Sequence, residues 1–491
     1  MGIVFVPLYI HFIGIEAYGL VGVFACLLGI FGFLDMGLSS TMNREMARLA
    51  VQEDKAQDMR DLLRTLEIPY CIVGLLIAVV VIMASPLIAN HWVQVKELSP
   101  KTVRIAIMLM GLCVAARWPI GFYSGGLMGL QRQVLLNVIN IVVATFRGVG
   151  AILILWLIAP TVEAFFSWQL VVSIVHVSLI VFFLRRSLPH AAESPRFRLR
   201  LLKSVWRFAA GMTGIGVAST LLMQLDKVIL SRMLSLDAFG YYTLASVMAT
   251  TLYRLVSPVY AATYPRLTNL VQMHSDEELA RLYHKSAQLV SMLVLPVALV
   301  IALFSKDILL LWTRNAVTAE QTHLLVTLLV TGTAIHCMMF IPYALQLAYG
   351  WTRLALCINV VSVVLLVPLM IVLATWYGAV GAASVWIILN VGYIVFGIHI
   401  MHQRLLHNEK RRWYFEDVGR PLLAAVVVGA IGRYVINPDW SFFLLLVSLG
   451  VVSGTTLLAS VLAANQLDAV GRMKSLLTTL HVGRATMGKT R

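Results

Sequence analysis

The chain has 491 residues, of which 60% are hydrophobic and only 12% are charged. Soluble globular proteins are typically about 45 to 50% apolar and about 25% charged, so this composition excludes a soluble protein and requires lipid as the solvent. The net charge of +15 is compatible with a nucleic-acid partner only if the basic residues cluster. They fall instead in short polar breaks along the chain, so we expect no nucleic-acid partner.

Apolar runs long enough to cross a bilayer recur along the whole chain, since a spanning helix needs about 20 apolar residues. They predict an all-α integral membrane protein of about fourteen transmembrane helices. The first six spans are expected at Met1–Ile13, Tyr18–Met42, Ile68–Ala89, Val103–Gly125, Val134–Ile158 and Ala164–Leu184. The next six are expected at Trp206–Leu230, Gly240–Ala262, Ala287–Leu311, Leu324–Leu345, Ala355–Trp376 and Val380–Met401, and two more at Pro421–Ile436 and Phe442–Ala464. The first span is short, and we expect it to be truncated.

Most of the 38 basic residues lie in one set of alternate loops. Because Lys and Arg are concentrated in cytoplasmic loops, both termini are predicted to be cytoplasmic. The polar stretch after the second span has Met59, Leu62, Leu63 and Leu66 at helical spacing, and the matching stretch in the second half has Leu279, Leu282 and Tyr283. We interpret both stretches as helices that lie on the membrane surface.

The chain is similar to itself. The run GIEAYGLVGVF at Gly14 matches SLDAFGYYTLA at Ser235, an offset of about 221 residues. At the same offset Arg60 matches Arg281, and Arg132 matches Arg353. A repeat of six spans begins and ends on the same side of the membrane, so the two copies are predicted to be parallel six-helix bundles around a central cavity.

This repeat predicts the domain organisation. We expect an N-lobe at residues 1–200, a C-lobe at residues 201–418, two additional spans at residues 419–466 and a cytoplasmic basic tail at residues 467–491. The five cysteines are scattered through apolar runs without metal-ligand spacing, so neither a metal site nor a cofactor is predicted. No catalytic residues are expected, because no loop is long enough for a catalytic domain.

Several motifs in order resemble one known family. They are AYGLVGVF, LDMGLSS, GLMGLQRQVLLNVIN, LLMQLDKVILSRMLSLDAFGYY, YPRLTNL and PYALQLAYGWTRLALCIN. Together they resemble the polysaccharide-transporter branch of the multidrug/oligosaccharidyl-lipid/polysaccharide exporter (MOP) superfamily, which includes the O-antigen and exopolysaccharide repeat-unit flippases of bacteria. The resemblance covers essentially the whole chain.

The resemblance implies a function. The chain would move an undecaprenyl-diphosphate-linked oligosaccharide from the cytoplasmic to the periplasmic leaflet of the bacterial inner membrane by alternating access, without chemical change to the substrate. It also implies a polysaccharide polymerase and a chain-length regulator as partners. No nucleotide-binding loop is found, so the drive is expected to be an ion gradient of H⁺ or Na⁺ or the consumption of the substrate after translocation.

Charged residues inside the spans are the candidate functional residues, because a charge exposed to lipid is costly. Arg117, Arg147 and Arg254 are predicted to line the central cavity and, with Lys227, to bind the diphosphate or an acidic sugar, since a guanidinium group pairs with phosphate in a bidentate fork. The alternative is that each arginine pairs with a neighbouring carbonyl or carboxylate and holds helices together.

Asp226 and Asp35 are the candidate ion-coupling residues. Asp226 and Lys227 are adjacent, so on a helix they point about 100° apart and are expected not to face one another. The alternative for Asp226 is a buried charge pair between helices, and for Asp35 a role in ending or orienting its helix. His176 is interpreted as a satisfied interior histidine.

Two other functions stay open. A cation-coupled drug or metabolite antiporter of the same superfamily would have a smaller and more acidic cavity. A membrane enzyme of polysaccharide assembly, such as a polymerase, would need a sizeable periplasmic loop, and the sequence has none. The lipid-linked oligosaccharide flippase is therefore the preferred interpretation.

Overall fold

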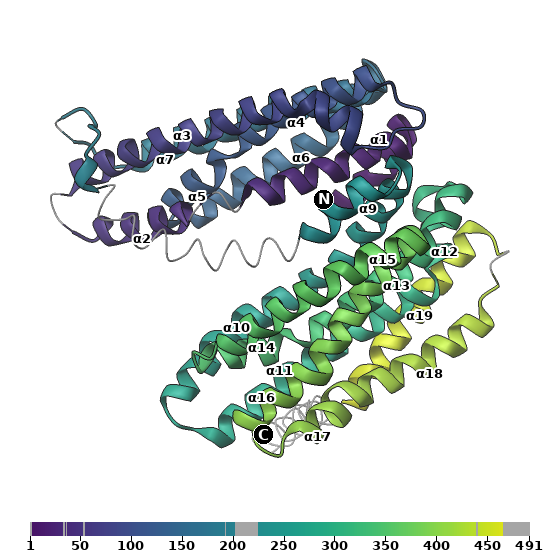
Figure 1. Ribbon diagram of the computed structural model, residues 1–491. Helices are drawn as coiled ribbons and strands as arrows, with labels where there is room; N and C mark the ends of the chain where they lie inside the picture. The colour runs from purple at the N-terminus through teal and green to yellow at the C-terminus, as the bar shows by residue number, and fades with distance from the viewer. Residues whose placement is uncertain are drawn as a thin grey trace, which may run out of the picture. The chain divides into compact units, whose positions relative to one another are not determined.

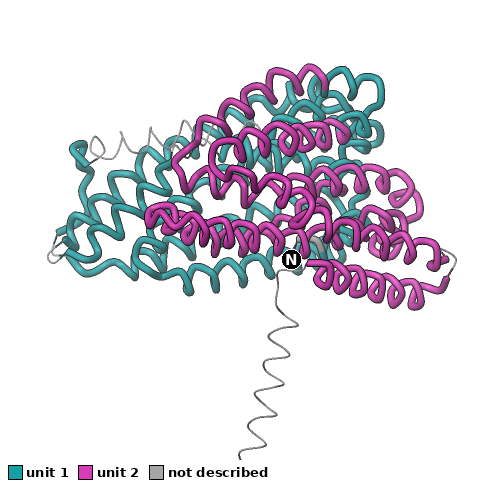
Figure 2. Tube along the Cα trace, turned by 90° about the horizontal axis from the view of Figure 1, so that it is seen from below, with its two compact units in different colours: residues 1–244, 370–382 teal, residues 245–369, 383–491 magenta. Residues whose placement is uncertain are grey.

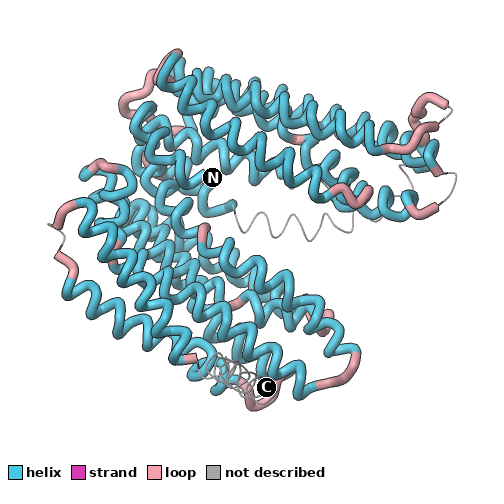
Figure 3. The backbone as a smooth tube through the Cα atoms, turned by 180° about the vertical axis from the view of Figure 1, so that it is seen from behind, coloured by secondary structure: helices cyan, strands magenta, loops and turns pink. Residues whose placement is uncertain are grey.

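The computed structural model of this chain describes residues 2–32, 35, 37–52, 55–191, 193–201, 224–437 and 440–464. These residues form helices joined by short loops, and no strand occurs among them (Figure 3). The predicted all-α membrane class is confirmed. Most of the predicted span Trp206–Leu230 and the whole of the predicted tail lie outside the described residues.

Ten helical segments of the described residues are long and apolar enough to cross a membrane. Two of them, α1 (Gly2–Gly32) and α15 (Arg353–Gly392), contain an internal break at a glycine with positive φ, namely Gly14 (φ 81°) and Gly378 (φ 57°). Both breaks lie where the sequence predicts one span to end and the next to begin, and glycine adopts positive φ without steric cost. The number fourteen stays a prediction.

The contacts divide the chain into two compact units, which Figure 2 colours separately. Unit 1 comprises residues 1–244 and 370–382. Its helices after α1 are α2 (Leu38–Ala50), α3 (Ala56–Leu87), α4 (Pro100–Arg117), α5 (Pro119–Gly129), α6 (Gln133–Leu157), α7 (Val162–Ser187), a helix at residues 224–233 and the first part of α9 (Leu236–Thr250). Helix α3 packs against α4, α4 against α7, α7 against α6, and α6 against α1 (Figure 1).

Unit 2 comprises residues 245–369 and 383–491. Its helices are α10 (Leu252–Gln272), α11 (Asp276–Leu303), α12 (Ser305–Thr313), α13 (Ala316–Met338), α14 (Phe340–Ala348), most of α15, α16 (Ile398–Arg404), α17 (Lys410–Arg412), α18 (Arg420–Val435) and α19 (Phe442–Ala463). Helix α11 is the centre of this unit, because it packs against α10, α13, α18 and α19.

The prediction of two separate helices on the membrane surface is wrong. Helix α3 begins at Ala56 and runs without a break into the following span, and α11 does the same from Asp276. The reason is that the apolar stripe packs against protein instead of lipid: Leu62 and Leu66 are 2% and 0% exposed, and Tyr283 of α11 is fully buried. The two polar stretches are therefore the membrane-external ends of long helices.

Helix ends repeat at the offset seen in the sequence. Trp118 separates α4 from α5, and Met339, 221 residues later, separates α13 from α14. The next turn has a positive-φ residue in each half, Gln131 and Gly350. Helix α6 begins at Gln133 and α15 at Arg353. The two halves thus share one order of helices and breaks.

Matched glycines bring the two halves into contact within unit 1. A Cβ on Gly19 of α1 would lie 2.3 Å from the carbonyl oxygen of Leu236, and a Cβ on Gly240 of α9 would lie 2.4 Å from that of Ile15. Gly19 matches Gly240 and Ile15 matches Leu236 in the repeat, so the crossing is symmetric. Small residues let helix backbones approach this closely in membranes.

A loop at residues 93–99 holds the start of the second half in unit 1. The carboxylate of Glu16 accepts hydrogen bonds from the backbone N–H groups of Lys96, Glu97 and Leu98 at 2.5, 2.9 and 3.1 Å. The ammonium group of Lys96 also pairs with Asp237 at 2.9 Å, and this contact raises the pKa of Lys96. Residues up to Leu244 therefore group with unit 1. The lobe boundaries at residues 200 and 418 stay a prediction.

Candidate functional site

Unit 1 contains a cavity of about 410 Å³ among α1, α2, α3, α4, α5 and α7. Its volume is in the range of ligand pockets, about 300 to 1,000 Å³. The lining is apolar on one part and polar on another: it comprises Leu28, Phe31, Gly32, Asp35, Ser39, Tyr70, Val114, Arg117, Trp118, Ile120, Gly121 and His176. The cavity thus brings together two of the predicted site residues, Arg117 and Asp35.

Asp35 lies between α1 and α2 and is held by three donors. Its carboxylate accepts hydrogen bonds from the N–H of Ser39 at 3.3 Å, from the Ser39 hydroxyl at 2.5 Å and from the Tyr70 hydroxyl at 2.5 Å. The positive φ of Gly37, 66°, turns the chain between Asp35 and the first turn of α2. Asp35 therefore orients the start of α2 and, at the same time, presents a carboxylate to the cavity.

Arg117 is the last residue of α4, next to the helix break before Pro119. Its side chain is half-buried, and its guanidinium carbon lies 5.9 Å from the centre of the Phe24 ring. No carboxylate of the described residues pairs with it within 4 Å. The cation is therefore stabilised by an aromatic face and is not neutralised by an acid of the described chain.

Arg147 lies in the middle of α6 and is not among the lining residues. Two of its nitrogen atoms, Nε and one terminal Nη, are buried and have no hydrogen-bond partner among the residues that the structure describes. Its charge acts electrostatically on Arg117 and His176, which do line the cavity. Trp168 donates a hydrogen bond to the backbone carbonyl of Arg147 at 3.2 Å and so fixes α7 to α6 at this level.

His176 of α7 lines the cavity, whereas the sequence analysis interpreted it only as a satisfied interior histidine. Its Nε2 atom lies 3.1 Å from the side-chain oxygen of Asn140, but its Nδ1 atom is buried without a partner. Tyr70 is a second such residue, because its hydroxyl is bound to Asp35. Both are polar residues inside apolar spans, and this is the only feature of the sequence that points to them as site residues.

Asp226 and Lys227 form an ion pair, and the expectation that they do not face one another is wrong. The Lys227 ammonium lies 3.4 Å from the nearer Asp226 carboxylate oxygen, and the Tyr242 hydroxyl donates to the other oxygen at 3.2 Å. The flexible four-carbon side chain of lysine crosses the 100° between neighbouring helical positions. Neither residue lines the cavity that contains Arg117.

Arg254 lies on α10 in unit 2, so it belongs to the other compact unit. Its side chain is exposed and makes no ion pair with the described residues. The structure therefore brings Arg117, Asp35 and His176 together, adds the charge of Arg147, and leaves Arg254 and the Asp226–Lys227 pair elsewhere. Substrate binding and ion coupling by these residues stay predictions.

The arrangement is suited to an anion. Buried donors are nearly always hydrogen-bonded in folded proteins, so each exception in a native structure calls for an explanation, such as an ion or ligand. Near this cavity the exceptions among the described residues are Trp118 Nε1, His176 Nδ1 and two nitrogen atoms of the Arg147 guanidinium group. A guanidinium group matches the geometry of phosphate or carboxylate oxygens. Among the described residues, no group of His, Cys, Asp and Glu has the geometry of a metal site.

Comparison with known proteins gives matches in both sequence and structure. A family model described as "Polysaccharide biosynthesis protein" matches residues 1–271. A putative O-antigen transporter of Shigella flexneri is 21% identical over 375 residues, which cover 76% of this chain and 87% of the relative.

Two solved structures share the fold. The lipid II flippase MurJ, in an inward closed conformation, has a TM-score of 0.62 and 11% identity over 90% of this chain and 96% of that one. An inward-facing multidrug resistance MATE family transporter of the MOP superfamily has a TM-score of 0.65 and 15% identity over 81% of this chain and 93% of that one. At these identities the likeness concerns the fold alone.

Proposed function

Because the chain belongs to the polysaccharide biosynthesis protein family, we propose that it is a flippase for lipid-linked oligosaccharides. The substrate is an undecaprenyl-diphosphate-linked polysaccharide repeat unit, and the flippase moves it from the cytoplasmic to the periplasmic leaflet of a bacterial inner membrane by alternating access. Both termini lie in the cytoplasm. The chain acts as a transporter and leaves the covalent structure of its substrate unchanged.

One observation carries this proposal: the buried guanidinium group of Arg147 has two nitrogen atoms without a partner, beside a cavity that contains Arg117. A diphosphate supplies several anionic oxygens, so it would pair with Arg117 in the cavity wall. It would also pair with Arg147 once that guanidinium group turns toward the cavity, which it does not line in this structure. A neutral drug supplies none of these charges. The names of two similar proteins, a putative O-antigen transporter and a lipid II flippase, support the same substrate class.

The diphosphate would enter the cavity with its charge toward Arg117 and Arg147, and the apolar residues Leu28, Phe31 and Val114 would cover the rest of the cavity wall. Arg117 stands at the α4–α5 break, and Asp35 at the α1–α2 break. Helix breaks of this kind allow helix segments to tilt during an access cycle. Binding at the breaks therefore couples occupancy of the cavity to a change in helix geometry.

A cation-coupled antiporter is the second candidate, and the observation that favours it is the carboxylate of Asp35 in the cavity wall. In the preferred function the same carboxylate, or that of Asp226, binds H⁺ or Na⁺ and drives the return step. A polymerase and a chain-length regulator would act on the translocated repeat unit.

The test is translocation of an undecaprenyl-diphosphate oligosaccharide by the full chain in proteoliposomes. Arg147→Ala and Arg117→Ala are expected to lower the rate by at least about tenfold, since a hydrogen bond to a charged group contributes about 1.5 to 3 kcal/mol. Arg104→Ala is the matched control, because Arg104 is an exposed cation at the other end of α4. Normal rates in all three variants at equal protein levels would refute the proposal.

A further inference from the structure

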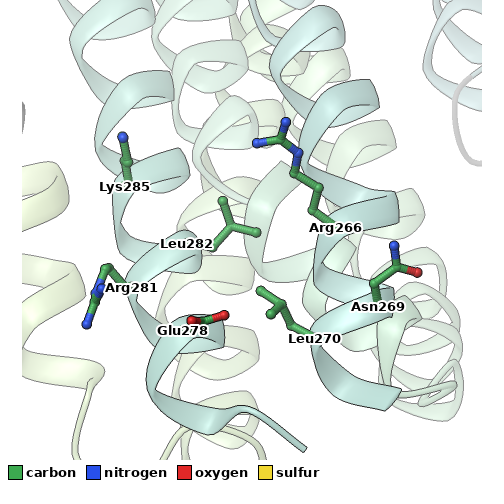
Figure 4. A pocket seen from close by; sticks show the side chains of 7 residues that line it. All are labelled: Arg266, Asn269, Leu270, Glu278, Arg281, Leu282 and Lys285. Carbon is green, nitrogen blue, oxygen red and sulfur yellow. The ribbon is translucent and has the colours of Figure 1, made fainter. Parts of the chain in front are cut away.

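A second basic pocket lies in unit 2, between the antiparallel helices α10 and α11. It has a volume of about 400 Å³ and is lined by Arg266, Asn269, Leu270, Glu278, Arg281, Leu282 and Lys285 (Figure 4). It contains none of the candidate residues of the proposed function. Its lining combines three cations and one carboxylate, that of Glu278, with an apolar floor of two leucines.

Two of the three cations have no counter-ion among the described residues. Arg281 pairs with Glu277 on its own helix at 2.8 Å. Arg266 and Lys285 make no ion pair and no side-chain hydrogen bond with the residues that the structure describes, although both are exposed. In Figure 4 the Arg266 side chain extends from α10 toward α11, and Leu270 and Leu282 lie between the two helices.

The internal repeat shows that the positions of Arg266 and Lys285 belong to ion pairs in the first half. In the first half, Glu45 pairs with Arg48 at 2.6 Å and Arg64 pairs with Glu67 at 3.4 Å. At the offset of 221 residues these two ion pairs become Arg266 with Asn269, and Lys285 with Gln288. Neither second-half pair contains a carboxylate, and each contains one cation: Arg266 stands where Glu45 does, and Lys285 stands where Arg64 does.

The unpaired cations lie at the depth where a bilayer carries phosphate. No residue of α11 from Ser286 to its end at Leu303 is charged. At 1.5 Å per residue this segment is about 27 Å long, close to the hydrocarbon thickness of about 30 Å. Lys285 therefore marks one edge of the hydrocarbon region. Glu278 lies about 10 Å farther out along the helix axis.

We propose that Arg266 and Lys285 bind the phosphate of an anionic phospholipid headgroup in this pocket, with Leu270 and Leu282 against the first carbons of its acyl chains. Two cations without carboxylate partners recognise the phosphate charge, and the apolar floor at the hydrocarbon edge favours a lipid over a free ion. The inference does not depend on the proposed function, because it concerns a different pocket in the other unit.

The test is native mass spectrometry of the full chain titrated with phosphatidylglycerol, with phosphatidylcholine as the zwitterionic comparison. The double variant Arg266→Ala with Lys285→Ala is expected to bind phosphatidylglycerol about 25-fold more weakly, because each cation at an anionic lipid surface contributes about a factor of five. Both side chains are exposed, so their removal leaves the packing of α10 on α11 intact.

The matched control is Arg48→Ala with Arg64→Ala, which removes the two cations that pair with Glu45 and Glu67 in the first half. This control is expected to bind phosphatidylglycerol as the wild type does. Equal affinity in the wild type and the Arg266/Lys285 variant would overturn the proposal. Displacement of the lipid by excess inorganic phosphate, with no preference for phosphatidylglycerol over phosphatidylcholine, would assign the pocket to a soluble anion and would also overturn it.

Discussion

Replacing Arg147 by methionine should make the protein more stable and less active. The Nε atom and one Nη atom of Arg147 are buried without partners, and each buried unpaired donor costs about 1 to 3 kcal/mol. Methionine has a similar length and no polar hydrogen. The hydrogen bond from Trp168 goes to the backbone carbonyl of Arg147, so it survives the substitution.

A gain of about 2 kcal/mol is therefore expected, at the lower end of the cost of two such donors. Unfolding entropy is about 2 cal/mol/K per residue, so this gain corresponds to a rise in Tm of about 4 °C for a body of the size of unit 1. The assay is thermal unfolding of the purified full chain in detergent, followed by translocation in proteoliposomes. Translocation should fall at least about tenfold, since the lost contact is a charge-assisted hydrogen bond.

The control is Arg433→Met in unit 2. Arg433 pairs with Asp307 at 3.0 Å, and the Asp307 side chain is 9% exposed. This substitution leaves a buried carboxylate without its partner, so it should lower Tm, by an amount that corresponds to about 1 to 3 kcal/mol. If Arg147→Met lowers Tm as Arg433→Met does, Arg147 is a structural residue and the reasoning about its unpaired donors fails.

Three further outcomes follow from the packing of unit 1. Gly240→Ala should destabilise the chain by several kcal/mol, because the new Cβ would lie 2.4 Å from the Ile15 carbonyl oxygen. The control is Gly454→Ala, which should leave Tm unchanged or raise it, because nothing lies within 4 Å of the new Cβ. Equal Tm shifts for the two variants would refute the close crossing of α1 and α9. Glu16→Gln should lower Tm by an amount that corresponds to about 1 to 3 kcal/mol, since a neutral amide accepts hydrogen bonds from the three loop N–H groups less strongly than a carboxylate. An unchanged Tm would show that Glu16 does not anchor the loop at residues 93–99. Tyr70→Phe removes one of the three hydrogen bonds to the Asp35 carboxylate and should lower Tm by an amount that corresponds to about 1 to 3 kcal/mol. An unchanged Tm would show that Tyr70 does not hold Asp35 in place.

The sequence predicted the fold class, the repeat and most helix ends, because these depend on local properties. A bilayer requires apolar runs of a fixed length, and glycines or prolines interrupt them. The breaks at Gly14 and Gly378 lie where the spans were expected to change. The surface helices were misjudged because an apolar stripe looks the same whether it faces lipid or another helix.

The candidate site was predictable only in part. Arg117 and Arg147 were found because a charge inside a span is costly, wherever the helix points. Three features depend on side-chain geometry: the lack of carboxylate partners for both arginines among the described residues, the presence of His176 and Tyr70 in the cavity of Arg117, and the ion pair of Asp226 with Lys227. A sequence pattern contains no information on which neighbours a rotamer reaches.

The sequence by itself determined that this chain is a membrane protein of two related halves, and it identified the charges that lie in its spans. Only the tertiary structure decided that residues 224–244 pack with unit 1, through Glu16, Asp237 and the matched glycines. It also decided that Arg64 pairs with Glu67, whereas the matched Lys285 makes no ion pair with the described residues. The physical reason is that the hydrophobic requirement acts on each segment separately, whereas charge pairing and close packing depend on residues from segments far apart in the chain.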